Sequence, residues 1–121
     1  MVDYIRTNND AAALVGEVVV TVPLASEYET VAASQTDQAM GATGAAGDYL
    51  ASVLIIPATT SPGAVSIKDG AGSAITVFTG GATSVADLKP FCVAIGAKSA
   101  AGAWKITTGA NVSAIGLGNF T

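Results

Sequence analysis

Few residues of the types that carry out chemistry occur in this chain, and histidine is missing altogether. Ser-His-Asp and Cys-His arrangements therefore cannot form, and zinc sites built from cysteine and histidine are excluded. The single cysteine, Cys92, has no histidine to act as its base, so we interpret it as a small residue of the core or of a sheet face. One cysteine also excludes a disulfide within the chain.

Carboxylates are the remaining candidates, because a glycosidase needs only Asp and Glu. Glu27 and Glu29 lie two residues apart. Asp48, Asp69 and Asp87 each stand at an expected turn or cap, where an aspartate accepts hydrogen bonds from the backbone. The string DGAGS, which begins at Asp69, lacks the further acidic ligands of a calcium loop. We therefore predict no catalytic residue, no cofactor-binding residue and no metal ligand, and we do not expect an enzyme.

The distribution of charge argues against several classes of partner. Nine acidic and five scattered basic residues give a net charge of −4, whereas nucleic-acid binding needs clustered Lys and Arg. The glycine-rich strings GATGAAG and TGGATS lack the lysine of a phosphate-binding loop, so we interpret them as turns. The start of the chain does not resemble a signal peptide, and the longest apolar run, 49–57, is too short to span a membrane. We expect neither a nucleic acid nor a membrane as partner.

The elements that must position these residues are short strands. Glycine and proline recur about every ten residues, with runs rich in Val, Ile and Thr between them, which is typical of a sandwich or barrel. The run 49–56 is apolar on both faces, which predicts a central strand or one covered on its outer side. The segment 28–37 has only a weak pattern. Strands are expected over 17–22, 38–42, 49–56, 64–68, 74–79, 90–97, 104–108 and 112–117.

Turn residues connect these strands. Ser61-Pro62-Gly63 predicts a type II turn with positive φ at Gly63, and 69–72 predicts the turn of a hairpin. Ser84 and Asp87 have the spacing of a capping box, which predicts one helical turn before Pro90. The pattern as a whole predicts an all-β chain, an antiparallel β-sandwich of jelly-roll type with seven or eight strands.

We divide the chain into an N-terminal arm, residues 1–15, and a sandwich domain, residues 16–121. The arm is polar and then rich in alanine, and a short helix is expected over 10–15. Only 12% of the residues are charged, against about 25% in an average protein. Much of the surface must therefore be small uncharged residues, or another subunit must cover part of it.

Strand and turn motifs between Gly41 and Gly118 carry a resemblance. They are GDYL before an apolar strand, SPGAVSIKDG as turn, strand and turn, then ITVFTGG, and GAWKITTGANV near the end. This stretch, about two thirds of the chain, resembles small virion proteins of tailed bacteriophages, in particular the head-decoration or capsid-associated proteins. None of the shared motifs is an active-site motif.

The resemblance implies a virion structural protein that decorates or cements the outside of a capsid. Its partners would be the major capsid protein and itself, as a trimer, and its location would be the capsid surface after assembly in the host cytoplasm. In such proteins an N-terminal arm commonly supplies the capsid contact, so by position Tyr4, Ile5 and Arg6 are candidate contact residues.

Other functions remain open. A head-fibre or tail-appendage module that recognises host-surface carbohydrate would share the fold, but it requires an exposed aromatic cluster. We expect Trp104 and Phe91 in the core instead, because they carry much apolar area and lie in alternating strands. A small glycosidase using Glu27, Glu29 and Asp48 and a structural subunit outside viruses are further alternatives.

Overall fold

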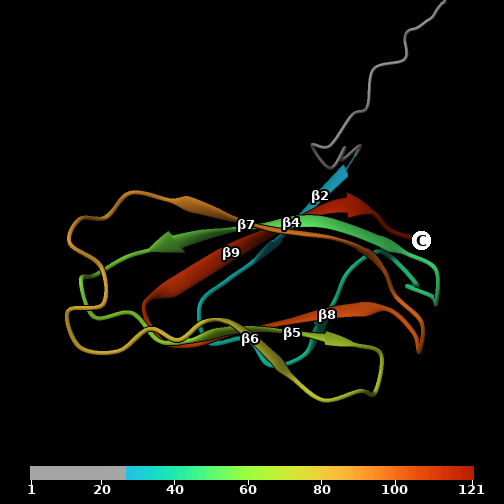
Figure 1. Cartoon of the computed structure of the whole chain (residues 1–121), viewed down its shortest axis with the longest axis horizontal. Helices are drawn as coiled ribbons and strands as arrows, with labels where there is room; N and C mark the ends of the chain where they lie inside the picture. The colour runs from blue at the N-terminus through green and yellow to red at the C-terminus, as the bar shows by residue number, and fades with distance from the viewer. Residues whose placement is uncertain (1–26) are drawn as a thin grey trace, which may run out of the picture.

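The computed structural model describes residues 27–121, and every regular element in that part of the chain is a β-strand (Figure 1). No helix occurs between these residues. The strands are β2 (Glu27–Val31), β3 (Gln38–Ala39), β4 (Tyr49–Pro57), β5 (Val65–Asp69), β6 (Ile75–Phe78), β7 (Phe91–Lys98), β8 (Trp104–Thr108) and β9 (Val112–Asn119).

The strands form two four-stranded sheets that pack face to face, and Figure 1 shows these two layers. One sheet has the order β2-β9-β4-β7 and is called the β4 sheet below; the other has the order β3-β8-β5-β6 and is called the β5 sheet. Every pair of neighbouring strands is antiparallel. The predicted antiparallel β-sandwich is therefore confirmed for the described residues.

The core lies between the two sheets and follows the period of two that strands impose on their side chains. Val53 and Ile55 point inward from β4, and Val65 and Ile67 point inward from β5. Each such burial stabilises the fold by about 1.5–3 kcal/mol. The other buried apolar residues are Val31, Met40, Leu50, Ala51, Trp104, Ile106, Val112, Ala114 and Phe120.

β4 lies between β9 and β7, which confirms the central position predicted from its apolar run. Its pairing register shifts between Leu50 and Ser52 against both neighbours. Because a bulge interrupts the alternation of side chains, the successive residues Leu50 and Ala51 are both buried. Beyond the bulge the alternation resumes, so that Ser52, Leu54 and Ile56 are only half-buried.

Some sequence-based predictions lie outside the described residues, and one strand was missed. The arm 1–15 with its helix, the strand 17–22 and the contact residues Tyr4, Ile5 and Arg6 belong to the part of the chain that is not described. The missed strand is β2. Its sequence, EYETV, has almost no alternation of apolar and polar residues, and only Val31 is fully buried. The other seven predicted strands correspond to β3 through β9.

Two predictions about turns are wrong. Residues 84–87 form no helical turn; instead the Asp87 carboxylate accepts a hydrogen bond from the backbone N–H of Lys89 at 3.1 Å, which favours a local bend over a helix. Gly63 does not have a positive φ. Glycine is needed there because a Cβ would lie 2.8 Å from the Cα of Gly109 and from the backbone nitrogen of Ala110. The hairpin of β5 and β6 is confirmed.

Candidate functional site

The outer face of the β4 sheet is the most distinctive surface of the described residues, because two complete rows across it carry no charge. The first row runs over four strands as Thr30, Ile115, Leu54 and Cys92. The second row runs as Tyr28, Leu117, Ser52 and Ala94. Ile56 and Ser113 form a further cross-strand pair beside them. We call these ten residues the uncharged face.

The members of this face point away from the core. Tyr28 is 69% exposed, and Cys92 and Ala94 at the other side of the sheet are exposed as well. Leu54 and Leu117 in the middle are half-buried, because their neighbours on the same face cover part of them. The Cys92 thiol lies 3.9 Å from the Ser52 hydroxyl, which agrees with a common face for β4 and β7. Such a surface is suited to burial against another protein.

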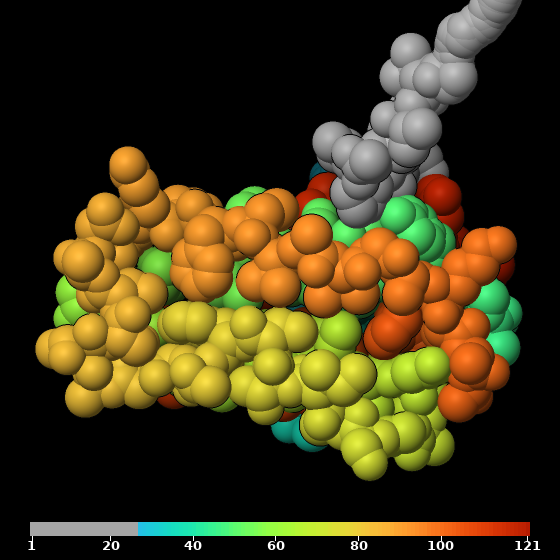
Figure 2. Space-filling model, viewed as in Figure 1, coloured from blue at the N-terminus to red at the C-terminus, as the bar shows by residue number. Residues whose placement is uncertain are grey.

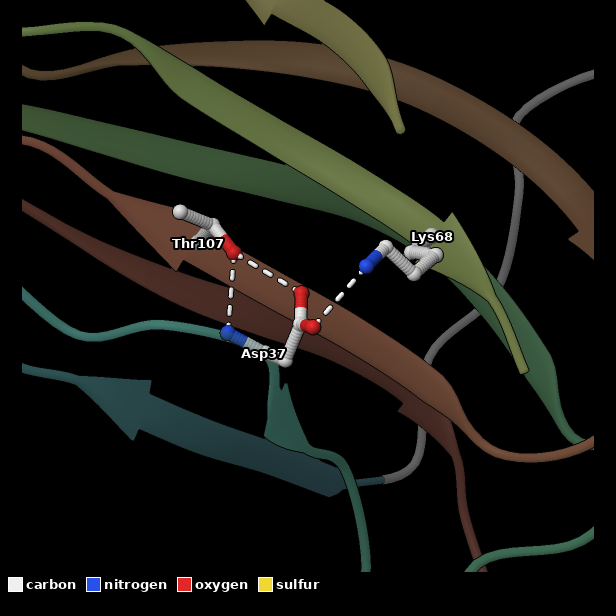
Figure 3. A network of polar contacts seen from close by, with 3 residues as sticks. All are labelled: Asp37, Lys68 and Thr107. Atoms are coloured by element: carbon white, nitrogen blue, oxygen red, sulfur yellow. Dashed lines mark hydrogen bonds and ion pairs between the residues drawn. The ribbon is translucent and has the colours of Figure 1, made fainter. Parts of the chain in front are cut away.

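The outer face of the β5 sheet has the opposite character. Lys68 and Lys105 stand opposite each other on β5 and β8, and Ser66 stands opposite Thr107. The Lys68 ammonium group lies 2.8 Å from the Asp37 carboxylate, and the Thr107 hydroxyl donates to the same carboxylate at 3.1 Å (Figure 3). The hydrogen bond from Lys68 is the main reason that the pKa of Asp37 is lowered. These charged and polar groups indicate that the outer face of the β5 sheet is in contact with solvent.

The network around Asp37 was not predicted from the sequence. Asp37 adopts a φ of 49°, and its backbone N–H donates to the Thr107 hydroxyl at 2.8 Å. The contact joins residues 70 positions apart, and Lys68 is 31 positions from Asp37. A single aspartate within a weakly patterned segment gives no local sign of such distant partners.

The three candidate glycosidase carboxylates have different surroundings. Glu27 is exposed at the start of β2. Glu29 accepts hydrogen bonds from the Gly41 backbone at 2.7 Å and from the Gln38 amide at 3.2 Å, so it connects β2 to the segment around β3. Asp48, by contrast, is buried beneath Thr121. Glu29 and Asp48 are therefore occupied by hydrogen bonds that join chain segments.

Asp48 is the most enclosed acidic group of the described residues, with 5% of its surface exposed. Its carboxylate accepts hydrogen bonds from the backbone N–H groups of Ala45 at 3.0 Å and Thr121 at 3.1 Å, and from the Thr121 hydroxyl at 3.0 Å. Burial alone would raise the pKa of Asp48, but these hydrogen bonds together outweigh burial and lower it.

Asp69 connects two loops in the same way. Its carboxylate accepts hydrogen bonds from the backbone N–H groups of Ala100 at 2.9 Å and Ala101 at 2.9 Å, and these bonds lower its pKa. It therefore attaches the β5–β6 turn to the β7–β8 loop. The prediction that Asp48, Asp69 and Asp87 serve backbone hydrogen bonding is confirmed.

The aromatic residues between 27 and 121 do not gather on the surface. Trp104 is 4% exposed, and its indole N–H donates to the Asp48 carbonyl at 3.0 Å, so its predicted core position is confirmed. Phe91 is partly buried against the core and packs edge-to-face on Phe78 with ring centroids 5.3 Å apart. Tyr28 is the exposed aromatic of the described part, and Tyr49 is half-buried.

The interpretation of Cys92 is confirmed for the sheet face and is wrong for the core. Cys92 is exposed on the outer side of β7, because the inward positions of that strand are taken by Phe91 and Val93. The uncharged face as a whole was indicated by one signal, the run 49–56 with apolar residues on both sides. The outward Ile115 and Leu117 of β9 belong to the same pattern.

Within residues 27–121, no three Cys, Asp or Glu side chains lie close enough to hold a metal ion together. Over the same residues, no helix has the length and apolar character needed to cross a membrane. Comparison of the chain with protein-family models, with curated proteins and with solved structures gave no match.

Proposed function

We propose that the protein is a structural component of a tailed-bacteriophage virion that attaches to the outside of the capsid and binds between subunits of the major capsid protein. This proposal rests mainly on the composition of the uncharged face. Its ten residues include four large aliphatic side chains and no charged one, whereas the opposite face of the sandwich carries Lys68, Lys105 and Asp37.

The proposed mechanism is burial of apolar area. A partner that covers about 800 Å² on each side forms an interface of ordinary size for a stable complex. Each copy that bridges two capsid subunits would add its burial to the cohesion of the shell. Self-association as a trimer and the arm contact through Tyr4, Ile5 and Arg6 are parts of the same proposal, and both come from the sequence resemblance.

The order of the strands gives a second line of support, through the jelly-roll interpretation. β2 pairs with β9, β3 with β8, β4 with β7 and β5 with β6, as the successive rungs of one long hairpin do. Such a hairpin, rolled so that its rungs alternate between two sheets, produces a jelly roll, an architecture that occurs in viral capsid and lectin domains. This support is an analogy of fold, which by itself assigns no function.

A matched pair of variants tests the face. Ser52→Lys places a charge in the middle of the uncharged face, and Ser66→Lys places the same charge on the outer side of β5, where Lys68 already stands. We expect Ser52→Lys to weaken binding to capsids that lack the chain by about tenfold or more, because the new charge must lose its water without gaining a partner. Ser66→Lys should leave binding unchanged.

The measurement is the amount of full-length chain that sediments with such capsids over a range of concentrations. Equal losses for the two variants would contradict the assignment of the face. A wild-type chain that does not bind these capsids, together with its absence from purified virions, would overturn the capsid role itself. Carbohydrate recognition has less support, because Trp104 is buried.

A further inference from the structure

One long side of the sandwich is apolar and incompletely closed. β7 and β6 are the last strands of their sheets there, and no other strand of the described residues pairs with their outer edges. Figure 2 shows this side, with β6 in yellow and β7 in orange lying one below the other along the molecule. Phe91, Val93 and Ile95 point inward from β7 but stay partly exposed, whereas Val53 and Ile55 on the neighbouring β4 are completely buried.

Along this side, the residues that normally protect an edge strand stand only at the two ends of β7, Pro90 directly before it and Lys98 as its last residue. Residues 91–97 of β7 include no charged side chain and no proline. Ile75 at the start of β6 and Leu88 just before β7 are each 52% exposed. An edge of this kind is a template for a further strand, and natural proteins usually block it with charges or prolines unless it is used.

The opposite side of the sandwich is closed by polar groups. There β2 carries Glu27 and Glu29, and the Gln38 amide donates both to the Glu29 carboxylate at 3.2 Å and to the Thr30 carbonyl at 2.9 Å. Hydrogen bonds thus connect the two sheets along this side. Of these two sides, the one with β7 is therefore better suited to pair with an additional strand.

We propose that residues 17–22 of a second copy of this chain pair with the outer edge of β7. Their sequence, EVVVTV, is the predicted strand with Val18, Val20 and Val22 on one face. Placed beside β7, these three valines would cover the exposed parts of Phe91, Val93 and Ile95. The other side chains, Glu17, Val19 and Thr21, would then extend the outer face of the β4 sheet next to Cys92.

The length of chain between residue 22 and β2 indicates whether the added strand comes from the same copy or from another one. Five Cα–Cα steps separate Val22 from Glu27, and fully extended they span at most about 18 Å. β2 is at the far end of the order β2-β9-β4-β7, so a strand beyond β7 lies four strand spacings away, about 19 Å. The direct path leaves no length for a turn, and the segment also contains Pro23. A strand from another copy has no such limit.

The consequence is self-association through two different surfaces, the segment 17–22 of one copy and β7 of the next. Contacts of this head-to-tail kind close into a ring or continue as a chain. This inference does not rest on the capsid role, because it concerns only contacts between copies.

The unique cysteine allows a test in the full-length protein. Val19→Cys would place a second thiol on the same face as Cys92, and Val20→Cys would place it on the opposite face of the added strand. After mild oxidation, we expect Val19→Cys to give covalent species larger than a dimer on a non-reducing gel, because each copy can join two others. Val20→Cys should not, and Val19→Cys combined with Cys92→Ser should give at most a dimer.

Three outcomes would overturn the proposal. A disulfide that closes within one chain would show that the segment reaches β7 of its own copy. Efficient Cys92–Cys92 dimers of the wild type would show that two β7 edges pair with each other. Equal cross-linking at positions 19 and 20, or none at either in variants whose thermal unfolding matches the wild type, would show that no strand adds at this edge. Thr21→Cys repeats the test at a second position.

Discussion

Individual aspartates hold together segments of this protein that lie far apart in the sequence. Asp48 joins the loop at Ala45 to Thr121, 73 positions away, and Asp69 joins its turn to Ala100, 31 positions away. Each carboxylate accepts hydrogen bonds from backbone N–H groups of loops, which have no neighbouring strand to bond to. The sequence indicated the role of these residues as backbone acceptors, because an aspartate next to glycine is typical of turns, but it gave no information about their distant donors.

Replacement of Asp48 by asparagine should reveal what the charge contributes. Asp48→Asn keeps the shape but loses the charge on the acceptor, so we expect about 1 kcal/mol less stability at pH 7. Because the folded state lowers the pKa of Asp48, its contribution is complete above the unfolded-state pKa of about 3.9 and is lost as the pH falls through the lower folded value.

Urea unfolding of both proteins at neutral and at acid pH measures this effect. The stability difference should be present at pH 7 and should disappear once Asp48 is protonated in the wild type. Asp87→Asn serves as the control, because Asp87 is exposed and accepts one local hydrogen bond from Lys89. A difference for Asp48→Asn that stays constant with pH would contradict a role for the charge.

At the level of the elements, seven strands could be predicted and β2 could not, for a physical reason. Strands such as β4 and β8 alternate in burial, and this period of two is written directly in their sequences. β2 is an edge strand with one fully buried side chain, and its place is set by pairing with β9, more than 80 residues later in the chain. Pairing across such a distance leaves no local pattern to detect.

The close contact between the Pro62–Gly63 turn and the β8–β9 loop should contribute to the stability of the fold, and this can be tested. The Gly63 N–H donates to the Ala110 carbonyl and the Gly109 N–H donates to the Ala64 carbonyl, both at 2.8 Å. Gly63→Ala would force these backbones apart, and we expect a loss of about 1–3 kcal/mol of stability. Thermal unfolding measures this loss, with Thr60→Ala as a neighbouring exposed control. An unchanged midpoint would mean that the two loops can separate without cost.

For the whole molecule, the two broad faces of the sandwich have different surfaces. One carries the ion pair of Lys68 with Asp37, and the other carries two uncharged rows. This difference could not be read from the composition, because the 12% of charged residues says nothing about where they lie. Only the register of the strands places Leu54 beside Ile115 and Cys92.

An attachment that uses the uncharged face should respond little to salt. Ionic contacts weaken as the Debye length shrinks from about 14 Å to about 3 Å between 0.05 and 1 M salt, whereas apolar burial does not. We expect the affinity for capsids to change by less than about threefold over this range. Co-sedimentation at both salt concentrations measures it, and a large loss at high salt would show that charged groups, and not the uncharged face, make the main contact.

The buried position of Trp104 gives the protein an internal reporter. It is the single tryptophan of the chain, its indole lies in the core, and its N–H is hydrogen-bonded to the Asp48 carbonyl. Its fluorescence emission will shift to longer wavelength when the two sheets separate and water reaches the ring. A ligand that covers only the outer faces leaves the ring untouched. One optical signal can therefore separate variants that fail to fold from variants that fold and fail to bind.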